Sequence, residues 1–277
     1  MEYKEIGAVK LSALGIGTYG FGGGLTRDTS NDRRDIEALQ YAIELGMTHI
    51  DTSEMYADGH SEELIGQAIR DFDRHSLFVA TKVFQSGLTF NGVIEGCKQS
   101  LRRLGTDYVD LYLIHWPNLK IPLSETIQAM DELVRQGSAR FIGVSNFSIK
   151  LLKQAQELSH HPILTDQVEY SLLVKNPESD LLPYCQKNDI FLTAYRPIGR
   201  GRIRAGVNQV LDDVAKEHNR TAVQVALNYL ICQENVLVIP KAAQRHHLEE
   251  NLGSMGWRLD QEDIRALQQA FQTTIAV

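Results

Sequence analysis

Cysteine is scarce in this chain, with Cys97, Cys185 and Cys232 as the only three among 277 residues. Their odd number and wide spacing argue against a disulfide framework and against a zinc cluster, so we expect reduced thiols. Long apolar runs are also missing, since no stretch reaches the roughly 20 residues that span a bilayer. The N-terminus lacks the pattern of a signal peptide. We therefore expect a cytoplasmic protein that does not enter a membrane.

Basic residues are also fewer than acidic ones. Lysine and arginine number 28 against 35 aspartates and glutamates, which gives a formal net charge of −7 and argues against a nucleic-acid partner. His49, His60 and His75 show no metal-ligand spacing, so we expect no metal site. No proline- or serine-rich linker divides the chain. We expect a single domain over residues 1–277, present as a monomer or a weak homo-oligomer.

The chain does have a regular alternation of helical and strand patterns. Several helical patterns stop at a glycine, as at Gly46, Gly105 and Gly137, where a left-handed residue can end a helix. Alternating strands and helices predict a parallel sheet, and eight such units predict closure into a (β/α)8 TIM barrel, an α/β fold of roughly 250 residues. The expected strands cover residues 14–18, 47–50, 77–81, 109–114, 140–144, 164–168, 190–194 and 236–239.

Additional elements are expected around the barrel. Residues 3–11 alternate loosely around Gly7, which predicts an N-terminal β-hairpin, and we place it over the bottom of the barrel. Extra helices are expected at 207–217 and, towards the C-terminus, at 261–271. The other helices assigned from the pattern cover 149–158, 178–187 and 221–232.

Four polar residues stand at or just beyond the ends of expected strands: Asp51, Tyr56, Lys82 and His115. A parallel barrel brings the carboxyl ends of its strands together around one pocket. An acid, a phenol, an ammonium and an imidazole in one cleft can together donate a proton to a carbonyl. Taken singly, each residue could have a purely structural role. Asp51 could cap a helix, Tyr56 could pack, Lys82 could snorkel and His115 could be a core histidine. Their joint placement favours catalysis.

Gly15, Gly17 and Gly20 match the GxGxxG pattern of a Rossmann dinucleotide site. That pattern needs a helix directly after it, yet residues 21–31 are glycine-rich and polar, without helical periodicity. We instead expect a loop at the barrel mouth that brings Thr18 and Tyr19 close to a ligand, with an ordinary loop as the alternative.

Longer motifs occur along most of the chain. They include HIDTSEMY at 49–56, DLYLIHWP at 110–117 and IGVSNF at 142–147, with shorter ones at 81–82, 166–170, 194–201 and 239–241. In their order and over nearly the whole chain, these segments resemble the strand-end motifs of the aldo-keto reductase superfamily.

The resemblance implies an NAD(P)H-dependent oxidoreductase that reduces aldehydes or ketones to alcohols by hydride transfer from nicotinamide C4. Tyr56 would be the general acid. A tyrosine pKa of about 10 is high for this task, and the ammonium of Lys82 would favour the phenolate. Asp51 would hold Lys82 in place, and His115 would orient the carbonyl by a hydrogen bond.

The resemblance also implies the cofactor contacts. Ser145, Asn146 and Gln167 would hold the nicotinamide carboxamide, and Tyr195 would stack on the nicotinamide ring. The basic loop Arg196, Arg200, Arg202 and Arg204 is a candidate for contact with the pyrophosphate, with a solvated charged loop as an equal alternative. The full set of expected cofactor contacts is Thr18, Tyr19, Asp51, Ser145, Asn146, Gln167, Tyr195, Arg196, Arg200, Lys241, His247, Glu250 and Asn251.

The adenosine end departs from the family pattern. Ala242 stands where many relatives have serine or threonine, and His247 stands where an arginine commonly meets the 2′-phosphate. Arg245 and His246 are nearby substitutes. We expect NADP(H) to be preferred. NAD(H) remains an option because imidazole, unlike guanidinium, is only partly charged near neutrality.

The expected substrate is a small-molecule carbonyl compound. Only about 26 residues follow Asn251, so a long C-terminal substrate loop is not expected and the pocket should be open. Aromatic residues around it suggest hydrophobic or aromatic carbonyls, with Phe21 as an additional lining candidate. The assigned substrate contacts are Tyr19, Tyr56, Phe84, His115 and Trp116.

Two other functions compete with this one. Family members resembling channel β-subunits bind NADPH as regulatory subunits with little turnover, which is the main alternative; the lack of an appended N-terminal segment makes it the less favoured one. A Schiff-base mechanism at Lys82 would need a neutral lysine, and the neighbouring Asp51 favours the charged form.

Overall fold

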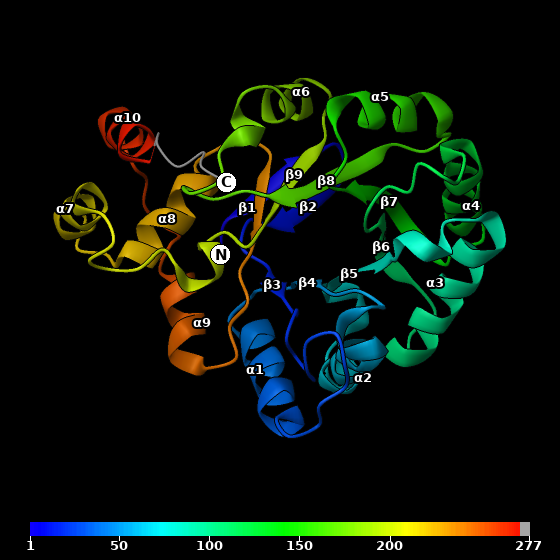
Figure 1. Cartoon of the computed structure of the whole chain (residues 1–277). Helices are drawn as coiled ribbons and strands as arrows, with labels where there is room; N and C mark the ends of the chain where they lie inside the picture. Colours follow the sequence, from blue (N-terminus) through cyan, green and yellow to red (C-terminus); the bar gives the residue numbers. More distant parts are fainter. Residues whose placement is uncertain (272–277) are drawn as a thin grey trace.

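The computed structural model describes residues 1–271, in which eight parallel strands form a barrel surrounded by helices (Figure 1). The strands pair in chain order, and the ring closes between its first and last members. There Val238 N–H donates to the carbonyl of Ala13, and Gly15 N–H donates to the carbonyl of Val238, both at 2.8 Å. The barrel strands are β3 Ile16–Gly17, β4 His49–Asp51, β5 Phe78–Val83, β6 Val109–Ile114, β7 Ala139–Ser145, β8 Ile163–Glu169, β9 Phe191–Tyr195 and β10 Val236–Ile239.

The helices follow the strands and pack on the outside of the barrel. Two lie between β9 and β10, and two follow β10, so the extra helices are confirmed. They are α1 Asp32–Glu44, α2 His60–Ala68, α3 Phe90–Leu104, α4 Leu123–Arg135, α5 Ile149–Leu158, α6 Leu181–Lys187, α7 Gln209–Glu217, α8 Ala222–Ile231, α9 Arg245–Leu252 and α10 Gln261–Ala270. Within residues 1–271, none of these helices combines the length and the apolar character that a membrane crossing requires.

Side chains alternate between two cores along each strand, as the period of a β-strand requires. In β6, Leu111 and Leu113 face the barrel interior, whereas Tyr112 and Ile114 pack against the surrounding helices. The strands are therefore apolar on both faces, which is why they read as continuous hydrophobic runs in the sequence.

The hairpin lies where the sequence placed it. Strands β1 Tyr3–Ile6 and β2 Val9–Ser12 pair antiparallel, and Leu11 is part of the barrel-interior core. Ile6 and Val9 pack against the same core, which includes Phe78 at the first position of β5. The hairpin thus closes the amino-terminal end of the barrel and leaves the carboxyl end for a site.

Two elements are clearly shorter than expected. Helix α6 begins at Leu181 instead of residue 178, because the side chain of Asp180 accepts a hydrogen bond from Leu181 N–H and caps the helix there. Strand β3 covers only two residues, and Leu14 contributes an isolated bridge to Val238. The remaining strands agree with their expected ranges to within about two residues.

Candidate active site

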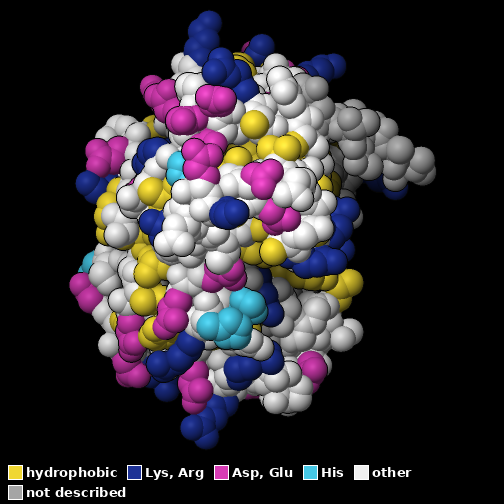
Figure 2. Space-filling model, turned by 90° about the vertical axis from the view of Figure 1, so that its left-hand side faces the viewer, with side chains coloured by type: hydrophobic (Ala, Val, Ile, Leu, Met, Phe, Trp, Pro, Cys, Tyr) yellow, Lys and Arg dark blue, Asp and Glu magenta, His cyan; other side chains and the backbone are white. Residues whose placement is uncertain are grey.

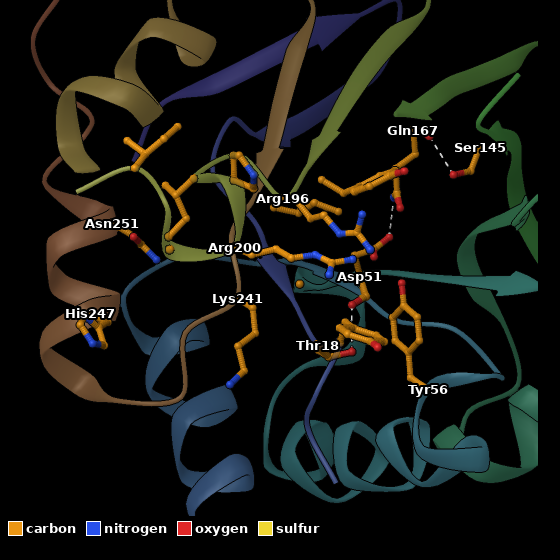
Figure 3. Close-up of a pocket in the computed structure, with 18 of the residues that line it drawn as sticks. Thr18, Asp51, Tyr56, Ser145, Gln167, Arg196, Arg200, Lys241, His247 and Asn251 are labelled. Carbon is orange, nitrogen blue, oxygen red and sulfur yellow. Dashed lines mark hydrogen bonds between the residues drawn. The ribbon is translucent and has the colours of Figure 1, made fainter. Parts of the chain in front are cut away.

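A cavity of about 660 Å³ opens at the carboxyl ends of the strands (Figure 3). Asp51 and Tyr56 lie towards one end of it, Lys241, His247 and Asn251 towards the other, and arginines from the β9–α7 loop reach between them. All but two of the assigned site residues line the cavity. The lining set contains Thr18, Tyr19, Asp51, Tyr56, His115, Trp116, Ser145, Asn146, Gln167, Tyr195, Arg196, Arg200, Lys241, His247, Glu250 and Asn251.

Lys82 does not line the cavity because it is completely buried beneath it. Its Nζ donates to Oδ1 of Asp51 at 2.7 Å and to the carbonyl of Thr52 at 2.6 Å. Burial alone would lower the pKa of Lys82, but the carboxylate of Asp51 and the phenol of Tyr56 more than offset it and raise that pKa. The lysine therefore stays protonated, which disfavours the Schiff-base alternative.

Tyr56 lies above this ion pair, with the centre of its ring 5.1 Å from Nζ of Lys82. A short turn, Tyr56–Gly59, holds it there, and Ala57 and Asp58 adopt positive φ values of 51° and 54° in that turn. Burial raises the pKa of Tyr56 above 10, although Lys82 acts in the opposite direction. The ammonium of Lys82 thus acts on the phenol in the expected direction, but the effect of burial is larger.

His115 follows β6 and completes the group. Its ring lies 5.7 Å from that of Tyr56, between centres. Burial, assisted by the charge of Lys82, lowers the pKa of His115 to about 3. The imidazole is therefore neutral at physiological pH and carries a single ring proton.

The expected carboxamide site is a connected set of amides and hydroxyls. Ser145 Oγ donates to the carbonyl of Gln167 at 2.7 Å, and Gln167 Nε2 donates to Oδ2 of Asp51 at 2.7 Å. Asn146 Nδ2 donates to Ser145 Oγ at 2.9 Å, and Tyr195 donates to Asn146 Oδ1 at 2.8 Å. These groups offer both donors and acceptors without net charge, which is what a neutral carboxamide requires.

The far end of the cavity is polar and basic. Lys241 is exposed there, although partial desolvation of its ammonium lowers its pKa. His247 is about half exposed, with Nδ1 3.5 Å from a carboxylate oxygen of Glu250. A group of histidine side chains, bordered by both basic and acidic ones, stands out on this side of the molecule, which carries α9 (Figure 2).

Several nearby residues lie elsewhere than expected. Arg245 packs over the ring of Tyr41, 4.3 Å from its centre, and is not among the lining residues. From the basic loop, Arg204 lines the cavity with Arg196 and Arg200, whereas Arg202 donates back to the carbonyl of Gly199.

Two aromatic assignments need correction. Phe84 does not line the cavity within residues 1–271; it lies behind His115, with ring centres 6.1 Å apart. Phe21 is completely buried under Lys241 and is not a lining residue either. Phe21 follows the glycine-rich segment and Phe84 follows the end of β5. At such positions the sequence does not determine the direction in which a side chain points.

Several residues at the site were not predicted from the sequence. Leu25, Met55 and Val223 add apolar surface to the cavity. Ser53 contacts His115 through a 3.0 Å hydrogen bond. Its position between Asp51 and Tyr56 was the only available signal. The loop after Gly20 is not helical until Asp32, which agrees with rejection of the Rossmann reading.

Comparisons with known proteins are consistent over the whole chain. A model described as "Aldo/keto reductase family" matches residues 13–272. The methylglyoxal reductase YeaE of Escherichia coli is 38% identical over 98% of this chain and 96% of its own length. The aldo-keto reductase Tm1743, solved with the inhibitor epalrestat, is 46% identical with a TM-score of 0.95, covering 98% of this chain and 100% of that one. An aldo-keto reductase of Klebsiella pneumoniae in complex with NADPH is 35% identical with a TM-score of 0.89, covering 100% and 98%.

Proposed function

This chain belongs to the aldo/keto reductase family and reduces carbonyl groups with NADPH, and we propose that Tyr56 supplies the proton in this reaction. The observation that carries the proposal is the burial of the Asp51–Lys82 ion pair directly beneath Tyr56. An ammonium placed there stabilises the phenolate that proton transfer leaves behind.

Tyr56 would act late in the reaction. Its raised pKa means that the phenol keeps its proton at neutral pH until negative charge develops on the substrate oxygen. Lys82 then compensates the charge of the phenolate, and Asp51 keeps Lys82 in position. The bound cofactor supplies the hydride that adds to the carbonyl carbon.

His115 would be a hydrogen-bond donor and not an acid. A neutral imidazole has one N–H, and directing it at the substrate oxygen would place the carbonyl between His115 and Tyr56. Two converging donors would stabilise the developing oxyanion.

The residues present fit an NADP cofactor. Ser145, Asn146 and Gln167 would hold the carboxamide, and Tyr195 would cover one face of the nicotinamide. Lys241 and His247 line the far end, where a 2′-phosphate would need positive charge. NADH remains the alternative because His247 stands where a guanidinium would bind a phosphate bidentately.

We infer that the substrates are small carbonyl compounds with an apolar side. Methylglyoxal is a candidate because of the relative that is named for it. Tyr19, Leu25 and Trp116 are large, at least 44% exposed and at the cavity wall, so they can also cover an aryl or alkyl group. A cytoplasmic location and a monomeric or weakly homo-oligomeric state stay predictions.

The test is oxidation of NADPH at 340 nm with methylglyoxal and a panel of aromatic aldehydes. Tyr56→Phe should lower kcat by about 100-fold or more, since general acid catalysis contributes about that much, while NADPH still quenches tryptophan fluorescence. Tyr184→Phe is the matched control, because that hydroxyl binds Gln156 on the outer helices.

Undiminished turnover by Tyr56→Phe would refute the assignment of the proton donor. Tight NADPH binding without turnover in the unchanged protein would instead favour the regulatory-subunit alternative.

A further inference from the structure

Ser53 and His115 form a buried contact that the proposed reaction has not used so far. Ser53 is completely buried on the segment between β4 and Tyr56, and its Oγ lies 3.0 Å from Nδ1 of His115. The two residues are 62 positions apart in the chain, so the barrel, and not local sequence, brings them together.

The hydroxyl of Ser53 has one proton and two neighbouring acceptors. Nδ1 of His115 is at 3.0 Å, whereas the carbonyl of Lys82 is at 3.5 Å. That carbonyl also receives the backbone N–H of Glu54, at 3.4 Å. On the other side, Met55 N–H points at Oγ of Ser53 from 3.4 Å and occupies one of its lone pairs. The imidazole nitrogen is the closer acceptor, and within the described part of the chain it has no other hydrogen-bond partner.

The direction of this hydrogen bond decides what His115 offers to the substrate. The ring is neutral, so one nitrogen carries the proton and the other carries a lone pair. If Nδ1 were protonated, Nε2 would present a lone pair to the carbonyl oxygen, and the two would repel. If Ser53 donates to Nδ1, the proton is on Nε2, which has no protein partner within residues 1–271 and belongs to a cavity-lining residue.

We propose that Ser53 is a positioning residue whose hydroxyl donates to Nδ1 of His115 and fixes the tautomer in which Nε2–H binds the substrate oxygen. The proposal rests on the function assigned to His115 above. It assigns a role to a small residue that touches neither substrate nor cofactor and acts through the orientation and tautomer of the imidazole.

Long-range 1H–15N correlation spectra of the unchanged protein with NADP+ test the tautomer directly. The His115 signals, identified by their loss in His115→Asn, should show an unprotonated Nδ1 and a protonated Nε2. In Ser53→Ala, Nδ1 loses its donor, and we expect the spectrum to move toward a mixture of tautomers.

Kinetics complete the test. Ser53→Ala should lower kcat/KM for carbonyl substrates by about 10- to 100-fold, the equivalent of one buried hydrogen bond, without changing the NADPH dissociation constant. Ser100→Ala is the matched control, since Ser100 is also completely buried and accepts a hydrogen bond from Arg103, far from the cavity on α3. This control should leave kcat/KM unchanged.

The outcomes separate this proposal from the proposed function. A protonated Nδ1 in the unchanged protein would overturn it, and so would an unaltered kcat/KM in Ser53→Ala while Tyr56→Phe remains inactive. Full activity of Tyr56→Phe would refute the proton donor but would leave the tautomer of His115 to be read from the spectrum alone.

Discussion

Asp166 is a carboxyl group without adequate partners. It is completely buried in β8, next to Gln167 but on the outer face of the barrel, and within residues 1–271 its Oδ2 accepts no hydrogen bond. Its other oxygen is 3.5 Å from Phe147 N–H. Burial therefore raises the pKa of Asp166 to about 8, and the folded protein holds this side chain in its protonated form at neutral pH.

Protonation of Asp166 makes stability depend on pH. The pKa is higher in the folded state than the value of 3.8 for an exposed carboxyl, so the folded state binds the proton more tightly. This stabilisation is complete below about pH 4, and the free energy of unfolding then falls by about 1.4 kcal/mol per pH unit until about pH 8. Asp166→Asn should remove this slope and stabilise the protein at pH 7 to 8.

Urea unfolding at pH 5, 7 and 8 measures the effect of Asp166→Asn. Asp107→Asn, at an exposed position, is the control and should parallel the unchanged protein. A slope that Asp166→Asn leaves intact would show that another group is responsible.

The loop between β3 and α1 is the element that brings Tyr19 and Leu25 to the cavity. Gly22 holds it in place with a φ of +69°, and a Cβ there would lie 2.6 Å from Cδ2 of His60. His60 cannot easily move, because its two ring nitrogens contact Asp32 and Glu63 at 2.9 and 2.8 Å.

Gly22→Ala should therefore displace this loop. We expect a loss of about 1–3 kcal/mol in stability and a raised KM for bulky carbonyls, with a smaller effect on methylglyoxal. Gly24→Ala is the matched control, since within residues 1–271 no heavy atom beyond its chain neighbours lies within 4 Å of its Cβ position. Thermal unfolding and KM measured side by side would decide the matter, and equal behaviour of the two variants would contradict the role of Gly22.

At the scale of elements, the sequence predicted most of the architecture. Strands 109–114 and 236–239 were recognised with their exact bounds, because a buried parallel strand is an uninterrupted apolar run. The sequence also predicted that Asp51, Tyr56, Lys82 and His115 lie close together, since strand ends converge in a barrel, and their catalytic role stays a proposal. The orientation of Phe21 and Phe84, the net pKa of Tyr56 and the Ser53 contact were not, because each depends on burial and on partners remote in sequence.

At the scale of the molecule, the proposed cofactor contacts extend from Thr18 to Asn251 and join strand ends with α9. A ligand that binds only this folded arrangement stabilises it by mass action, by about 2.7 kcal/mol at 100 times its dissociation constant. NADPH should therefore raise Tm more than NADH does at equal concentration.

His247→Arg should widen that difference. A guanidinium pairs with a 2′-phosphate at any physiological pH, and one charge-assisted hydrogen bond corresponds to about tenfold in affinity. Thermal shifts and dissociation constants for both cofactors check this expectation. An equal gain for NADH and NADPH would mean that residue 247 does not meet the 2′-phosphate.

The β1–β2 hairpin covers the amino-terminal end of the barrel and closes it. Leu11, Ile6 and Val9 fill that end, and Lys82 above them has no exposed surface. Tyr56 lines the cavity at the other end of the barrel, so solvent reaches it through the opening of that cavity. In the proposed reaction the phenolate of Tyr56 would be reprotonated through the same opening by which the alcohol departs, so a product that dissociates slowly would also delay reprotonation.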